Sequence, residues 1–148
     1  MSDLHDLYQE MIVDHYKAPR NFRTIQDATC HGEGYNPLCG DKVTVQLKIE
    51  DGVVKEVAFE GTGCAISTAS ASMMTEAIKG KSLEEIERLY AGFHNLITGE
   101  AQSAGVDLGK LKAFGGVSEF PVRVKCASLP WHTLRSALHA DKKPVSTE

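Results

Sequence analysis

Hydrophobic and polar residues alternate along one stretch in the middle of the chain, and a second apolar stretch follows it. In residues 43–49 (VTVQLKI) every second residue is aliphatic, and apolar residues again predominate in residues 53–59 (VVKEVAF). Alternation with a period of two is typical of a strand that buries one face. The Asp51-Gly52 pair between the two stretches favours a tight hairpin turn. The pattern therefore predicts an antiparallel hairpin over residues 43–59.

Apolar residues at helical spacing predict helices on both sides of this hairpin. Spacings of three and four residues recur in residues 3–17, in the stretch that follows Cys64 and in residues 83–97. Pro19 is suited to end the first of these helices, and Gly80 is suited to end the second. The chain therefore combines the hairpin with at least three amphipathic helices.

Serine residues indicate where two of the helices begin. Ser82 and Glu85 form a capping box, which predicts the start of the helix over residues 83–97. Ser128 is the expected N-cap of a last helix over residues 129–139, whose first turn tolerates Pro130.

The other stretches are expected to be less regular. Residues 20–36 have the composition of an extended segment and loop, and residues 99–120 that of a loop with one short helix at 108–114. We expect the tail to be frayed from about residue 141. The pattern as a whole predicts an α+β fold, a small antiparallel sheet with helices packed mainly on one face. A length of 148 residues fits one domain over residues 1–148.

Charge and hydropathy exclude several classes of protein. Twenty acidic and 16 basic residues give a net charge of −4, whereas nucleic-acid-binding proteins are more often basic, so we expect no nucleic acid partner. The longest uncharged stretch, residues 61–75, is too short and polar to span a membrane, and the N-terminus has no secretory signal. We therefore expect a cytoplasmic protein whose cysteines stay reduced, which favours metal-binding or reactive cysteines over disulfides.

Three of the four cysteines lie at comparable places in the predicted fold. Cys39 comes just before the first hairpin strand, Cys64 just after the second, and Cys126 just before the expected N-cap of the last helix. Because the start of one hairpin strand lies beside the end of the other, Cys39 and Asp41 should lie near Cys64. Cys126 would join them if the last helix packs with its N-terminus at this end.

The residue types suit a metal site, although other interpretations stay open. Helix N-termini favour thiolates, glycines such as Gly40 and Gly63 permit close approach, and three sulfurs with one carboxylate suit tetrahedral zinc. However, a free cysteine is often a small buried residue, and no C-x-x-C spacing is present. For Cys30 we prefer the packing interpretation.

Four stretches resemble the IscU/SufU family of iron–sulfur cluster assembly proteins, which includes NifU N-terminal-like domains. They cover nearly the whole chain in the family's order and read YQEMIVDHYKAPRNF, NPLCGDKVTVQLKI, FEGTGCAISTASASMMTE and VRVKCASLPWHTL. The resemblance implies that Cys39, Asp41, Cys64 and Cys126 are the metal ligands. Lys125, where IscU-type scaffolds have a histidine, and the long gap between Cys64 and Cys126 resemble the SufU branch.

The SufU resemblance implies a zinc-dependent sulfurtransferase. Such a protein takes persulfide sulfur from a SufS-type cysteine desulfurase, here on Cys39, and passes it to downstream cluster-assembly proteins. One alternative is a scaffold that assembles a transient [2Fe–2S] cluster on the same ligands, because thiolates suit iron as well as zinc. A further alternative is a non-catalytic adaptor in which zinc only stabilises the fold.

Two basic residues lie close to Cys126 in sequence. Arg123 and Lys125 are candidates for stabilising the negative charge of a thiolate or persulfide at the site. The alternative is that both are solvated surface residues.

Overall fold

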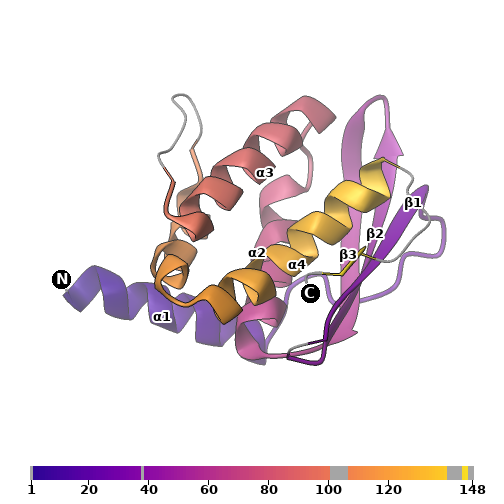
Figure 1. The fold of residues 1–148 in the computed structure, drawn as a ribbon. Coiled ribbons are helices and arrows are strands. Elements are labelled where there is room, and N and C mark those ends of the chain that lie inside the picture. Colours follow the sequence, from indigo (N-terminus) through magenta and orange to yellow (C-terminus); the bar gives the residue numbers. More distant parts are fainter. Residues whose placement is uncertain (1, 38, 101–106, 140–144, 147–148) are drawn as a thin grey trace.

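The computed structural model describes residues 2–37, 39–100, 107–139 and 145–146 (Figure 1). Its elements, in chain order, are α1 (Ser2–Lys17), β1 (Cys30–Asn36), β2 (Asp41–Glu50), β3 (Val53–Thr62), α2 (Ala65–Ile78), α3 (Leu83–Thr98), the 3-10 helix η1 (Gly109–Glu119), α4 (Pro121–Leu138) and β4 (Val145–Ser146).

The fold is α+β, as predicted. The sheet has the strand order β3-β2-β1-β4, in which β1, β2 and β3 pair antiparallel and the two residues of β4 pair in parallel with β1. The helices lie on one side of the sheet: α4 packs on β1 and β2, α2 packs on β3, and α1 and α3 lie farther out (Figure 1). The core forms between the sheet and α4, where the side chains of Val45, Leu47 and Leu129 are fully buried.

The hairpin prediction is confirmed because local chemistry determines this turn. Asp51 and Gly52 have φ values of 54° and 73°, the left-handed conformation that a two-residue hairpin turn requires. The capping box is also present, with the Ser82 hydroxyl accepting from the Glu85 N–H and the Glu85 carboxylate accepting from the Ser82 N–H. Gly80, with φ of 82°, follows the end of α2.

The expectation of an extended segment and loop over residues 20–36 was wrong in part, because Cys30–Asn36 pairs in the sheet as the strand β1. Two glycines in this segment concealed the strand, since glycine is depleted in strands. The structure gives them a packing role. A Cβ at Gly32 would lie 2.7 Å from the Thr133 carbonyl oxygen, and a Cβ at Gly34 would collide with the Thr133 hydroxyl. Glycine therefore allows α4 to approach β1 closely.

The predicted start of the last helix was also wrong. α4 begins at Pro121, in the position where a missing N–H costs nothing, and Ser128 is buried within the helix. Cys126 consequently lies in the second turn of α4 and not before an N-cap. Pro130 lies inside the helix and cannot donate to the carbonyl of Cys126, four residues earlier.

The remaining segments are only partly described. The short helix expected at 108–114 corresponds to the larger η1, whereas residues 101–106 of the same expected loop lie outside the described residues. Of the tail that we expected to be frayed, residues 145–146 pair with β1 as β4. The extent of frayed tail and the single-domain boundary stay predictions.

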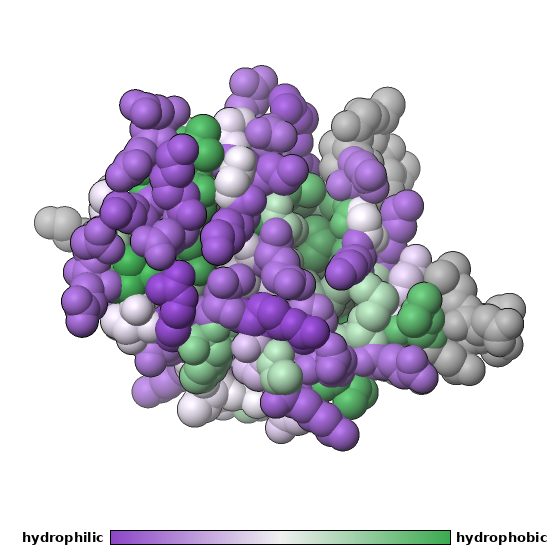
Figure 2. Space-filling view, turned by 180° about the vertical axis from the view of Figure 1, so that it is seen from behind, coloured by the Kyte–Doolittle hydropathy of each residue, from purple (hydrophilic) through white to green (hydrophobic). Residues whose placement is uncertain are grey.

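No helix within the described ranges is both long and apolar enough to cross a bilayer. Hydrophilic residues cover most of the face seen from behind, with hydrophobic residues exposed in small groups (Figure 2).

Candidate metal and thiol site

Three of the four predicted ligands converge where β1, β2 and α4 meet. The ligand atoms of Cys39, Asp41 and Cys126 all lie within 4.8 Å of one another. Cys39 lies in the turn between β1 and β2, Asp41 is the first residue of β2, and Cys126 comes from α4. The Cys126 thiol donates to the Cys39 sulfur over 3.4 Å. The fold therefore unites residues that are up to 87 positions apart in the chain.

Cys64, the fourth predicted ligand, borders this group. It is the N-cap of α2, and its backbone N–H donates to Asp41 Oδ1 over 2.8 Å. Its sulfur accepts from the Ser67 N–H over 3.5 Å. The Cys64 sulfur also contacts the Cys126 thiol, although it is not one of the three mutually close ligand atoms found among the described residues. The prediction of a cysteine at a helix N-terminus holds for Cys64 but not for Cys126.

The two glycines of the predicted site have distinct structural roles. Gly40 has φ of 71°, a conformation that residues with a Cβ rarely adopt. Gly63 lies against the ligands, where a Cβ would come within 2.6 Å of Asp41 Oδ1 and of the Ser67 hydroxyl. Gly63 therefore leaves the space in which the Asp41 carboxylate sits beside Cys64.

The predicted ligands differ strongly in exposure. Cys39 is exposed, whereas Asp41 and Cys126 are each 1% exposed. Burial raises the pKa of the Cys126 thiol, and hydrogen bonding with Cys39, Cys64 and Asp41 raises that pKa further. The buried thiol is accordingly protonated at neutral pH unless a cation compensates its charge.

A buried asparagine that we did not predict as a site residue lies between two of the ligands. Asn36 is 0% exposed, and its side-chain Nδ2 lies 3.4 Å from Asp41 Oδ2 and 3.6 Å from Cys126 Sγ. The only sequence signal was its place before Pro37 in the turn that leads to Cys39. Its contact with Cys126 depends on packing between β1 and α4, which no local pattern indicates.

The donor set fits a divalent cation of the zinc type. Thiolates and a carboxylate are zinc ligands, and a cation among them would favour the thiolate form of the buried Cys126. Cys39, Asp41 and Cys126 are the residues best placed to hold it, with Cys64 adjacent through the Asp41 hydrogen bond.

The other candidates lie at the edge of the site or away from it. Arg123 is exposed and Lys125 is half-buried, and neither side chain forms an ion pair or hydrogen bond with a described residue. Their predicted roles stay untested. Cys30 is partly buried at the start of β1 and packs against the hydrophobic core, as the packing interpretation expects.

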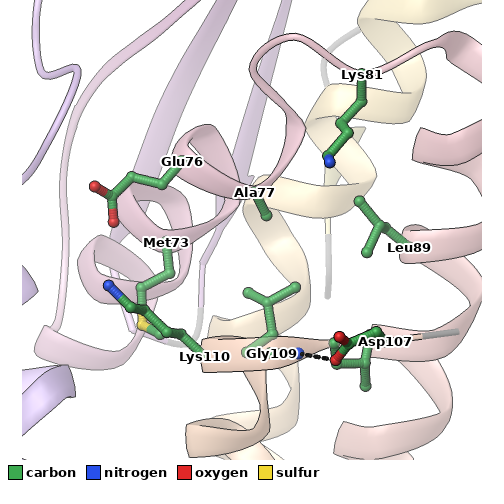
Figure 3. Close-up of a pocket in the computed structure, with 10 residues that line it drawn as sticks. Met73, Glu76, Ala77, Lys81, Leu89, Asp107, Gly109 and Lys110 are labelled. Atoms are coloured by element: carbon green, nitrogen blue, oxygen red, sulfur yellow. Dashed lines mark hydrogen bonds between the residues drawn. The ribbon is translucent and has the colours of Figure 1, made fainter.

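A separate cavity of about 400 Å³ lies between α2, α3 and the start of η1 (Figure 3). Lys81 and Lys110 border it on different sides, and the Asp107 carboxylate accepts from the Gly109 N–H over 3.0 Å. Glu76 adds a second acidic group. The lining contains no cysteine, so this cavity is distinct from the thiol site.

Comparison with known sequences identifies close relatives. The sequence profile described as the NifU-like N terminal domain matches residues 7–138. The zinc-dependent sulfurtransferase SufU of Bacillus subtilis is 42% identical over 137 residues, which cover 93% of this chain and 92% of that protein. The iron–sulfur cluster assembly scaffold protein IscU of Thermotoga maritima is 43% identical over 141 residues, covering 93% of this chain and 96% of that protein.

Comparison with solved structures gives a consistent result. A structure described as an iron–sulfur cluster assembly scaffold protein for the SUF system, from Fervidobacterium islandicum, superposes with a TM-score of 0.83 at 39% identity. The match covers 90% of this chain and 98% of that one. The resemblance in sequence therefore extends to the fold.

Proposed function

The chain belongs to the family of NifU-like N-terminal domains, and from that membership we propose that it is a zinc-dependent sulfur acceptor in iron–sulfur cluster assembly. Its sulfur would come as a persulfide from a SufS-type cysteine desulfurase. The observation that supports this most is the difference in exposure at the site, where Cys39 is accessible while Asp41 and Cys126 are buried. Cys39 is the most exposed of the three predicted cysteine ligands, so a partner's persulfide can approach it directly.

Cys39, Asp41, Cys64 and Cys126 would hold the zinc ion, which would supply a redox-inert positive charge that favours thiolates. The buried Asp41 and Cys126 would serve as anchors. Cys39, in the turn between β1 and β2, would be the ligand that can leave and react.

The transfer itself is a thiol–persulfide exchange. The Cys39 thiolate attacks the terminal sulfur of the desulfurase persulfide, and a new S–S bond forms on Cys39. The original S–S bond breaks, and the desulfurase cysteine leaves as a thiolate that takes up the proton of the persulfide or of solvent. Electrons balance without an external oxidant.

A second candidate function is a scaffold for a [2Fe–2S] cluster. The Thermotoga maritima relative named as a scaffold favours it, as does the convergence of thiols, since thiolates also bind iron. The same experiment separates the two functions.

The test measures cysteine turnover by a SufS-type desulfurase without added reductant, in the presence of the native chain, Cys39→Ser or Cys30→Ser. Cys30→Ser is the matched control, because Cys30 lies outside the ligand group. We expect the native chain and Cys30→Ser to raise turnover several-fold and to carry a persulfide detectable by mass spectrometry. Cys39→Ser should do neither while retaining its thermal stability.

Different results would contradict the proposal. Turnover raised equally by Cys39→Ser would exclude Cys39 as the acceptor. An inert native chain that binds a [2Fe–2S] cluster on anaerobic reconstitution would favour the scaffold. A parallel loss of stability and stimulation in Cys39→Ser would favour the adaptor in which zinc is structural.

A further inference from the structure

Asn36 connects three of the ligands from the end of β1. Its backbone carbonyl accepts from the Cys39 N–H over 3.3 Å and closes the turn that carries the exposed thiol. In the β1–β2 register it lies opposite Asp41. Its side-chain Nδ2 reaches Asp41 Oδ2 and Cys126 Sγ. Asn36 is thus hydrogen-bonded to both buried ligands, Asp41 and Cys126.

We propose that Asn36 is a positioning residue of the metal site, whose side-chain amide anchors Asp41 and Cys126 and leaves the exposed Cys39 free to react. The proposal rests on the proposed function for the identity of the metal. It assigns a cause to the difference between the buried ligands and the exposed one.

The chemistry of the amide supports this role. A buried amide group is costly unless it is hydrogen-bonded, and Asn36 is 0% exposed. An asparagine Nδ2 carries two N–H donors, which is the number needed for one carboxylate oxygen and one sulfur. A carboxylate and a metal-bound thiolate are both negatively charged acceptors, and charged acceptors strengthen such hydrogen bonds. The contacts should therefore tighten when the site is loaded.

The difference between the two buried ligands and the exposed one follows from the atoms that Asn36 contacts. The amide contacts the Asp41 and Cys126 side chains, whereas only the backbone of Cys39 is bonded to Asn36. Asp41 and Cys126 would therefore keep their orientation when the Cys39 sulfur leaves the site. Hydrogen bonds to ligands from outside the coordination shell typically matter by 10–100-fold in metal affinity.

Asn36→Leu tests the proposal, because leucine has a similar size but no N–H donor. Asn95→Leu on α3 is the matched control, since it makes the same change on a helix that supplies no ligand. Zinc affinity is measured by competition with a chromogenic chelator, and alkylation of each cysteine in the zinc-loaded protein is followed by peptide mass spectrometry. Neither readout uses the desulfurase, so failed sulfur transfer would leave this test intact.

We expect Asn36→Leu to lower zinc affinity about 10–100-fold and to make Cys126 nearly as reactive to alkylation as Cys39. The native chain and Asn95→Leu should bind zinc equally well and react first at Cys39. A folded Asn36→Leu protein with native zinc affinity and the native order of alkylation would overturn the proposal. A native chain that binds no zinc would overturn it as well.

A second measurement applies if Asn36→Leu does not fold. In the native chain, NMR signals of the Asn36 side-chain amide should shift on addition of zinc, and its protons should exchange more slowly with water. Signals that neither move nor gain protection would contradict a role in positioning the ligands.

Discussion

Cys39 and Cys126 are neighbours in space but belong to two different environments. Their sulfurs are 3.4 Å apart, yet Cys39 lies on an exposed turn and Cys126 is 1% exposed in α4. Near Cys39, Gly40 has a left-handed conformation with φ of 71°, and the Cys39 N–H donates to the Asn36 carbonyl. The position of Cys126 instead depends on the packing of α4 against β1. The comparison teaches that one site can combine an accessible thiol with a buried one when the first lies on a surface turn and the second on a packed helix.

Gly32→Ala should have the largest effect on the difference between these two cysteines. The new Cβ would meet the Thr133 carbonyl oxygen at 2.7 Å, so α4 must move away from β1. Overpacking of this kind costs about 1–3 kcal/mol of unfolding free energy, measurable by chemical denaturation. Alkylation of Cys126 should accelerate while that of Cys39 stays unchanged.

The control for this substitution is Gly116→Ala, at which no atom lies within 4 Å of the new Cβ. It should leave stability and both alkylation rates at native values. If Gly32→Ala instead accelerates alkylation of both cysteines equally, the two environments are not independent.

Arg123→Ala should have an intermediate effect, on the rate at which the exposed cysteine accepts sulfur. Arg123 is exposed in the first turn of α4, one helical turn before Cys126. If its charge attracts the persulfide or stabilises it on Cys39, its loss should slow sulfur acceptance a few-fold, less so at high salt. Arg135→Ala is the control, because Arg135 is an exposed arginine near the other end of the same helix. Equal rates for the two variants would indicate that Arg123 is a solvated surface residue.

Acid pH should have the smallest effect, a loss of folding stability that comes from a buried histidine. Burial lowers the pKa of His15, and the Arg20 charge lowers that pKa further. His15 is 4% exposed and bonds through Nδ1 to the Ser72 hydroxyl over 2.7 Å, which joins α1 to α2. The other charged groups that act on it are Glu76, Asp14 and Lys110.

The sign of the pH effect follows from the lowered pKa. Below the ordinary imidazole pKa of 6.5, the unfolded chain binds a proton that the folded chain resists, so unfolding free energy falls as pH decreases through this range. Denaturation of the metal-free protein between neutral and mildly acid pH measures the slope. His15→Gln should reduce it, and an unchanged slope would assign the effect to other groups.

Sequence patterns predicted the elements whose signals are local. The Asp51-Gly52 turn and the Ser82-Glu85 capping box formed as expected, because each depends on residues within a few positions. Sequence patterns led to wrong predictions where packing between elements decided the structure. The glycines of β1 suggested a loop, although they are needed because α4 crosses the strand closely. Ser128 suggested an N-cap, although α4 begins at Pro121 and buries this serine.

The sequence by itself supplied the candidate ligands, three cysteines and one aspartate, and the predicted hairpin placed Asp41, Cys39 and Cys64 at one end. The tertiary structure alone decided that Cys126 joins them, that its thiol is buried while Cys39 is exposed, and that Asn36 lies between the ligands. The physical reason is the distance along the chain over which each kind of interaction acts. Turn and cap preferences act between adjacent residues, whereas the exposure of a thiol depends on how a distant helix packs on the sheet.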